Sequence, residues 1–134
     1  MKEIWKDVKG YEGLYQVSNF GRVKSLNYNN TKKAKILIPK VIKNTGYLRV
    51  CLCKNGKVVD KKIHRLVMET FDPNKNTVKK CFDEEINFNK LCVNHIDENK
   101  LNCKLSNLEW CTHKYNDNYG SRPYKLSISH RKSQ

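Results

Sequence analysis

A histidine and three asparagines within residues 92–119 are of types that suit hydrolysis of a phosphodiester. His95 directly follows Asn94, Asn107 lies 12 residues after His95, and Asn116 comes later in the same segment. Such a hydrolase needs a base that deprotonates water, a cation near the charge developing on the phosphate, and a means of stabilising the leaving oxygen. Imidazole suits the first role at neutral pH. The amide oxygens of Asn94 and Asn116 suit a hard cation such as Mg²⁺, which takes few protein ligands.

The same residues also fit two other interpretations. A histidine at a strand end often only forms structural hydrogen bonds, and asparagines in a loop are commonly turn residues. The six cysteines include no CxxC pair, so in a reducing compartment we expect free thiols rather than disulfides. A zinc site built from scattered cysteines with His64 or His113 is the remaining alternative.

The elements that would position these side chains can be read from local signals. Residues 92–95 and 108–111 are predicted as strands separated by a polar loop. Thr112 is a predicted N-cap for a helix that runs to about Tyr119 and is closed by Gly120. Before this unit, residues 64–71 follow helical spacing, and Asp72-Pro73 ends that helix. We expect Trp110 to be buried against it, and residues 74–90 to be a connector.

The N-terminal half predicts short strands joined by turns. The expected strands are residues 4–8, 15–18, 22–26, 40–42, 47–53 and 58–63. The sequence Lys54-Asn-Gly56-Lys is a hairpin signal between the last two strands. Residues 27–35 are predicted as a polar loop that can follow a phosphate backbone. The aromatic residues of the first segment, namely Trp5, Tyr11, Tyr15 and Phe20, are expected in the core of a small sheet.

Charge is concentrated in this N-terminal half. The chain of 134 residues has 27 Lys and Arg against 13 Asp and Glu, and a net charge of +14. Residues 1–65 contribute +12 of it, and there is no acidic residue between Glu12 and Asp60. We expect this stretch to bind the backbone of double-stranded DNA. The cations expected to do so are Arg22, Lys24, Lys32, Lys33, Lys35, Lys40, Lys43, Arg49, Lys54 and Lys57.

Other partners and locations are disfavoured by composition. No apolar run approaches the roughly 20 residues of a membrane-spanning helix. The first residues lack the apolar stretch of a secretory signal, so we expect a soluble intracellular protein. No basic amphipathic helix is visible that would favour a membrane surface.

Three stretches of the chain carry a resemblance to known families. Residues 93–112, VNHIDENKLNCKLSNLEWCT, and residues 62–71, KIHRLVMETF, resemble HNH endonucleases of the phage and intron homing type. Residues 3–26, EIWKDVKGYEGLYQVSNFGRVKSL, resemble the nuclease-associated modular motif that often precedes this HNH type. The resemblance implies an α+β fold with a strand-rich DNA-binding module at residues 1–61. A ββα-metal nuclease unit at 62–120 and a basic tail at 121–134 would follow.

The resemblance also implies an activity and a role for each site residue. His95 matches the general base, and Asn107 matches the asparagine that braces the loop and orients that base. Asn94 and Asn116 match the two metal ligands, for one divalent ion with Mg²⁺ expected first and Mn²⁺ second. Many members carry aspartate where this chain has Asn94, so metal affinity would depend more on the DNA phosphate.

The implied activity is metal-dependent endonuclease cleavage of DNA, either nicking by a monomer or cutting of both strands by a homodimer. The products would have 5′-phosphate and 3′-hydroxyl ends. The alternative function is a catalytically inactive protein that binds DNA or RNA on the same fold.

Overall fold

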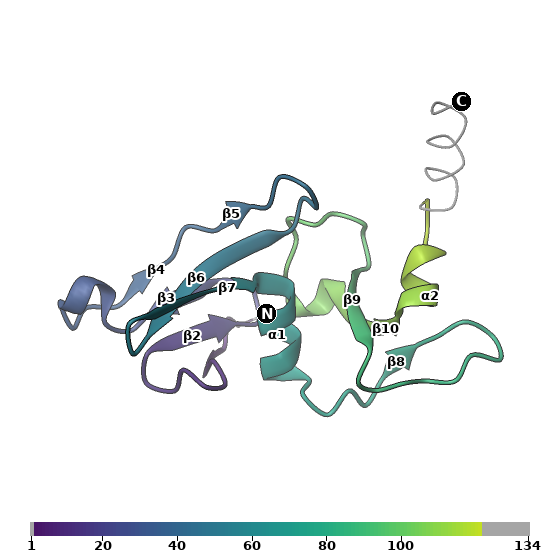
Figure 1. Ribbon diagram of the computed structural model, residues 1–134, viewed down its shortest axis with the longest axis horizontal. Helices are drawn as coiled ribbons and strands as arrows, with labels where there is room; N and C mark the ends of the chain where they lie inside the picture. Colours follow the sequence, from purple (N-terminus) through teal and green to yellow (C-terminus); the bar gives the residue numbers. More distant parts are fainter. Residues whose placement is uncertain (1, 122–134) are drawn as a thin grey trace.

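The structure is a computed structural model, and residues 2–121 are described here. This part of the chain forms three small sheets and two α-helices (Figure 1). The first sheet is antiparallel and follows chain order. Its strands are β1 (Trp5–Asp7), β2 (Tyr15–Ser18), β3 (Val23–Ser25) and β4 (Lys35–Ile36). A 3₁₀ turn, η1 (Tyr28–Asn30), lies between β3 and β4.

The second sheet is a hairpin with one added strand. Its antiparallel strands are β5 (Lys40–Val41), β6 (Leu48–Lys54) and β7 (Lys57–Lys62). Asn55 and Gly56 form the hairpin turn with φ values of 52° and 76°. Both values are positive, as a two-residue type I′ turn requires, and this explains the Asn-Gly pair.

The third sheet and the second helix hold the residues singled out for chemistry. Strand β10 (Leu108–Thr112) lies between β9 (Leu91–His95), to which it is antiparallel, and β8 (Val78–Lys79), to which it is parallel. The turn η2 (Leu105–Asn107) precedes β10, and α2 (His113–Asp117) follows it. The order strand, loop, strand, helix is therefore the one predicted for residues 92–119.

Helix α1 (Ile63–Phe71) lies between the N-terminal sheets and the third sheet (Figure 1). It contacts β2, β6 and β7 on one side and β9 and β10 on the other. One buried cluster therefore extends from Val17 of β2 through Val67 of α1 to Trp110 of β10. Trp110 is fully buried, as predicted, and its Nε1 donates to the Asp72 carbonyl at 2.8 Å.

A close approach of backbones joins the first sheet to the loop beyond β9. The Leu105 amide donates to the carbonyl of Asn19 at 2.8 Å. Next to it, Gly21 has a φ of +82°, and a Cβ there would lie 2.6 Å from the Cys103 carbonyl oxygen. Only glycine therefore fits at position 21 without moving the Cys103 backbone.

The α+β class predicted from the sequence is confirmed, and most elements lie within two residues of their predicted bounds. Three expectations were incomplete. The polar loop at residues 27–35 contains η1 and reaches β4, and the connector at 74–90 contains β8. Trp5 and Phe20 are only half-buried and lie outside the central cluster, and Trp5 lies beneath the cations of Arg22 and Lys24. No described helix is long and apolar enough to cross a bilayer.

Candidate active site

His95 is the last residue of β9, and its ring is 1% exposed. The Tyr47 ring stacks on it with the centroids 5.7 Å apart, and the His64 ring lies 5.1 Å away. Its Nε2 faces the Cys103 Sγ at 3.9 Å. Side chains from three other segments, Tyr47, His64 and Cys103, therefore hold the imidazole in one orientation.

His64 is the second residue of α1, and its ring packs beside that of His95. Its ring lies 4.6 Å from that of Tyr47, and its buried Nδ1 has no hydrogen-bond partner among the described residues. Burial, and after it the nearby charges of His95, Lys62 and Arg65, lowers the pKa of His64 to about 3. His64 is therefore neutral at physiological pH, and it presents His95 with an uncharged ring.

Asn107 ties the loop after β9 to the start of β10. Its Oδ1 accepts from the Asp97 amide at 3.0 Å, and its Nδ2 donates to the Asp97 carboxylate and the Asn102 carbonyl, each at 2.9 Å. The Ile96 amide also donates to the Asn107 carbonyl at 2.7 Å. The backbone that leaves His95 is thereby fixed on both sides.

Asp97 is the centre of this loop, a role that the sequence did not reveal. Its carboxylate also accepts from the Asn99 amide and the Asn102 side chain. Hydrogen bonding, first from Asn102, lowers the pKa of Asp97. The carboxylate is thus engaged within the loop.

Asn94 is fully buried and points toward β10. It lies directly opposite Glu109, and its Nδ2 donates to the Glu109 Oε2 at 2.8 Å. Glu109 carries no signal of its own in the sequence. Its position depends on the register of β9 and β10, and the loop of residues 96–107 between them is too long to dictate that register.

Asn116 is half-buried on α2, which packs against β9 and β10. Thr112 is the N-cap, as predicted, and its hydroxyl accepts from the Tyr115 amide at 3.2 Å. The same hydroxyl donates to the Glu84 carboxylate at 2.6 Å, which links the connector to the helix. The Tyr119 hydroxyl donates to the Ile96 carbonyl at 2.8 Å and ties the end of α2 to the loop after His95.

The candidate metal ligands are the amide oxygens of Asn94 and Asn116. Within residues 2–121, no three His, Cys, Asp or Glu side chains are grouped so that they could hold a metal ion. Asn94 and Asn116 lie on elements that pack together, and amide oxygens are ligands that hard cations accept. The residues present therefore fit a divalent ion with few protein ligands and give no geometry of their own for zinc.

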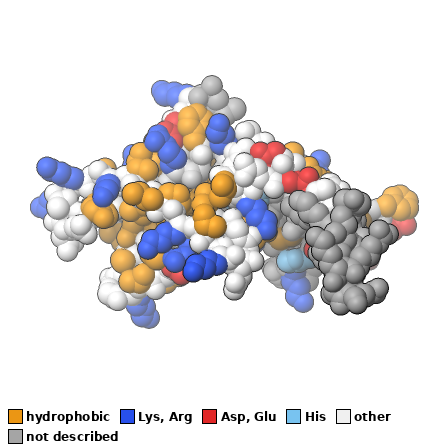
Figure 2. Space-filling view, turned by 90° about the horizontal axis from the view of Figure 1, so that it is seen from above, with side chains coloured by type: hydrophobic (Ala, Val, Ile, Leu, Met, Phe, Trp, Pro, Cys, Tyr) orange, Lys and Arg blue, Asp and Glu red, His pale blue; other side chains and the backbone are white. Residues whose placement is uncertain are grey.

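The predicted DNA-binding cations are spread over the first two sheets and their loops. Figure 2 shows blue side chains scattered among orange ones over the left and centre of the view, with few red ones. Some are paired by register, since Lys40 lies opposite Arg49 and Lys54 opposite Lys57. The others occupy the turn before β3, β3 itself, the loop after η1, β4 and the turn after β5, and they are Arg22, Lys24, Lys32, Lys33, Lys35 and Lys43.

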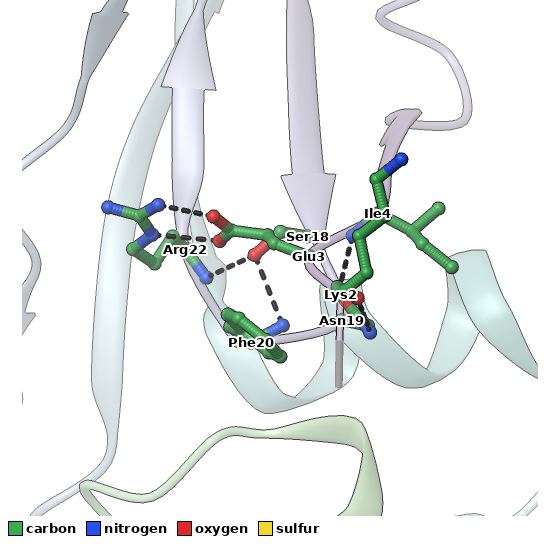
Figure 3. Close-up of polar contacts among 7 residues, drawn as sticks. All are labelled: Lys2, Glu3, Ile4, Ser18, Asn19, Phe20 and Arg22. Atoms are coloured by element: carbon green, nitrogen blue, oxygen red, sulfur yellow. Dashed lines mark hydrogen bonds and ion pairs between the residues drawn. The ribbon is translucent and has the colours of Figure 1, made fainter.

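Two of these cations already have acidic partners in the protein. Arg22 forms a two-pronged ion pair with Glu3 (Figure 3), and this hydrogen bonding lowers the pKa of Glu3 to about 2. Arg49 pairs with Asp60 at 3.0 Å. The positive charge that Arg22 and Arg49 present to a polyanion is therefore partly compensated. Lys24 lies instead over an aromatic ring, with its Nζ 4.3 Å from the centroid of the Trp5 ring.

Two family matches cover residues 3–26 and 93–112, which carried the resemblance, but not residues 62–71. The NUMOD4 motif matches residues 3–53, and the HNH endonuclease family matches residues 85–118. A solved structure described as DNA binding and cleavage by the HNH homing endonuclease I-HmuI has a TM-score of 0.67 and 36% identity. The match covers 98% of this chain and 68% of that one. The chain therefore belongs to the HNH homing endonuclease family.

The similar proteins come from a bacteriophage and a virus. DNA endonuclease I-HmuI of Bacillus phage SP01 is 43% identical over 112 residues, which are 84% of this chain and 54% of that protein. An uncharacterized HNH endonuclease of Acanthamoeba polyphaga mimivirus is 43% identical over 82% of this chain and 24% of its own length. A second one from the same virus is 35% identical over 86% and 29%. The chain thus spans about half of the phage relative and about a quarter of the viral ones.

Proposed function

We propose that this protein is a metal-dependent DNA endonuclease that hydrolyses phosphodiester bonds. The observation that carries the proposal is His95, a buried imidazole at the end of β9 that is packed by Tyr47, His64 and Cys103. It stands in the segment that matches the HNH endonuclease family. The relative named as binding and cleaving DNA shares the fold over nearly the whole chain.

In this proposal His95 is the general base. A neutral imidazole accepts a proton from the attacking water at physiological pH, and the neutral His64 ring beside it adds no positive charge that would oppose this step. Asn107 acts on the base through the backbone. Its hydrogen bonds to residues 96, 97 and 102 keep the loop, and with it the His95 ring, in one orientation.

Asn94 and Asn116 are the proposed metal ligands, through their side-chain oxygens. When bound, a divalent ion, with Mg²⁺ preferred to Mn²⁺, supplies positive charge beside the scissile phosphate and the leaving oxygen. Thr112 keeps Asn116 in place by capping α2, and the fully buried Asn94 is kept in place by β10. Because both side chains are neutral, the DNA phosphate itself is expected to contribute to the affinity for the ion.

The DNA is proposed to lie across the first two sheets, where the basic side chains gather. A two-stranded ribbon such as β6–β7 has dimensions that a major groove admits. The protein is proposed to act as a monomer or homodimer inside infected host cells, as its phage and viral relatives suggest.

Conversion of supercoiled plasmid tests the proposal. Purified protein is incubated with plasmid and Mg²⁺ or Mn²⁺, with EDTA in parallel, for wild type, His95→Ala and His113→Ala. His113 is an exposed residue of α2 and serves as the matched control. We expect nicked or linear product from wild type and His113→Ala, loss of product with EDTA, and a loss of at least about 100-fold with His95→Ala.

Because His95 is buried, thermal unfolding of each variant accompanies the assay. A folded His95→Ala protein that still cuts would exclude His95 as the base. If wild type binds several plasmids and cuts none with either metal, including one that carries DNA from the source genome, the DNA-binding alternative replaces the nuclease.

A further inference from the structure

Asn94 has its side-chain orientation set by a charge on the neighbouring strand. Its Nδ2 donates to the Glu109 Oε2 at 2.8 Å across a directly opposed pair of β9 and β10. A carboxylate only accepts hydrogen bonds, so the NH₂ group of the amide has to face it. The Oδ1 of Asn94 is consequently directed away from Glu109.

Glu109 also lies on the strand that packs against the helix carrying the second proposed ligand, since α2 contacts β10 as well as β9. Glu109 is half-buried. It is thus a negative charge beside Asn94, on a strand that packs against α2, whereas both candidate ligands are neutral amides.

A divalent cation held by amide oxygens alone lacks the anionic partner that hard cations prefer. Groups that hydrogen-bond to a ligand both orient it and raise its affinity for the metal, and their loss typically costs roughly 10–100-fold in that affinity. The neighbouring residues of β10 cannot take this role, because Leu108 and Trp110 are buried apolar side chains.

We propose that Glu109 is a positioning residue of the metal site, which directs the Oδ1 of Asn94 toward the cation and supplies the negative charge that the two asparagines lack. This inference rests on the proposed function, because it assumes that Asn94 and Asn116 hold the ion. Glu109 would then be a carboxylate of the site in addition to His95, Asn94, Asn107 and Asn116, the residues that the motif suggests.

The test measures metal binding without turnover. Side-chain amide signals of Asn94 and Asn116 are followed by NMR in the DNA-free protein during titration with Mn²⁺, whose unpaired electrons broaden nearby resonances. Wild type is compared with Glu109→Gln, which keeps the shape and removes the charge. The control is Glu85→Gln, the same charge change at an exposed connector residue.

We expect both amide signals to broaden first in wild type and Glu85→Gln, and to need at least about tenfold more Mn²⁺ in Glu109→Gln. The double variant Asn94→Asp/Glu109→Gln moves the carboxylate to β9 and the amide to β10. It keeps one charge in the pair and, followed through the Asn116 signal alone because Asn94 is replaced, should recover most of the lost affinity, which a variant that had lost its fold would not.

Equal broadening in wild type and Glu109→Gln would overturn the inference, as would the absence of selective broadening of these two signals in wild type at millimolar Mn²⁺. The same proteins are assayed for plasmid cleavage. If Glu109→Gln binds Mn²⁺ like wild type and wild type cuts DNA, the inference fails and the nuclease stands. If binding depends on Glu109 and no plasmid is cut, the metal site stands and the nuclease fails.

Discussion

The backbones of Gly21 and Cys103 approach closely where the first sheet meets the loop beyond β9, so a side chain at position 21 is expected to destabilise the protein. Replacing Gly21 with alanine places a Cβ 2.6 Å from the Cys103 carbonyl oxygen and 2.8 Å from its carbon. Both are backbone atoms, so the loop itself has to move. The φ of +82° adds a second cost, because residues with a Cβ disfavour that region.

The magnitude follows from the two costs. The left-handed backbone costs about 1–2 kcal/mol, and overpacking of a tight contact costs about 1–3 kcal/mol. We therefore expect Gly21→Ala to lower the free energy of unfolding by about 2–5 kcal/mol. Gly56→Ala is the matched control, because Gly56 has a φ of +76° and no atom within 4 Å of its Cβ position. It should cost only the backbone part, about 1–2 kcal/mol.

Urea unfolding followed by tryptophan fluorescence measures both variants, since Trp110 is fully buried in the shared core. The difference in free energy of unfolding between the two variants gives the contribution of the close contact with Cys103, because the change in unfolded-chain entropy is common to both. If Gly21→Ala lies within about 0.5 kcal/mol of Gly56→Ala, the backbone approach between the first sheet and the loop is refuted.

The residues around the site and in the basic loop support three further predictions. Thr112→Val removes the cap of α2 and should lower the free energy of unfolding by about 1–3 kcal/mol in urea titrations. The pKa of His64 is about 3 in the folded protein, so below the unfolded value near 6.5 the unfolded chain binds a proton that the folded chain does not. The free energy of unfolding should fall by about 1.4 kcal/mol as the pH is lowered from about 7.5 to about 5.5, and this loss should disappear in His64→Phe. Replacing Lys32 and Lys33 with alanine should make the plot of log binding constant for duplex DNA against log salt concentration less steep. The slope should fall in magnitude by roughly 0.9 for each phosphate that the variant no longer neutralises, measured by fluorescence anisotropy.

Each of these has an outcome that would contradict it. An unchanged urea midpoint in Thr112→Val would show that the hydroxyl does not cap α2. An equal pH dependence in wild type and His64→Phe would mean that His64 is protonated in the folded protein. For the lysines, Lys90→Ala, an exposed residue of the connector, is the control. If its salt slope changes as much as that of the loop variants, binding is not localised to the first two sheets.

The elements that the sequence predicted correctly are those with local signals. The pair Asn55-Gly56 dictates its turn through two positive φ values. Thr112 caps its helix because its hydroxyl accepts a hydrogen bond from the amide three residues later. Strand β8 was missed because two residues in a charged connector have no period, and their pairing with β10 depends on residues about 30 positions later.

The candidate site could be located from the sequence, but its supporting contacts could not. His95 was singled out by its residue type and its place at a strand end, whereas the role of Asn107 was implied by the resemblance to HNH endonucleases. The bond between Asn94 and Glu109 depends on strand register, and the contact of Gly21 with Cys103 joins segments about 80 residues apart. Tyr47, which stacks on His95, gave no signal because an aromatic residue before a strand is ordinary.

The central place of α1 sets an order in which the chain can reach its structure during translation. The helix buries its apolar face partly against β9 and β10, and the 41 residues from Asp72 to Thr112 have to be made before that partner is complete. At roughly 5–20 residues per second this takes about 2–8 seconds. The β6–β7 hairpin is local and can form as it leaves the ribosome. Meanwhile, Leu66 and Val67 lack part of their packing, so the nascent chain displays an apolar helix that chaperones can bind until the endonuclease segment is completed.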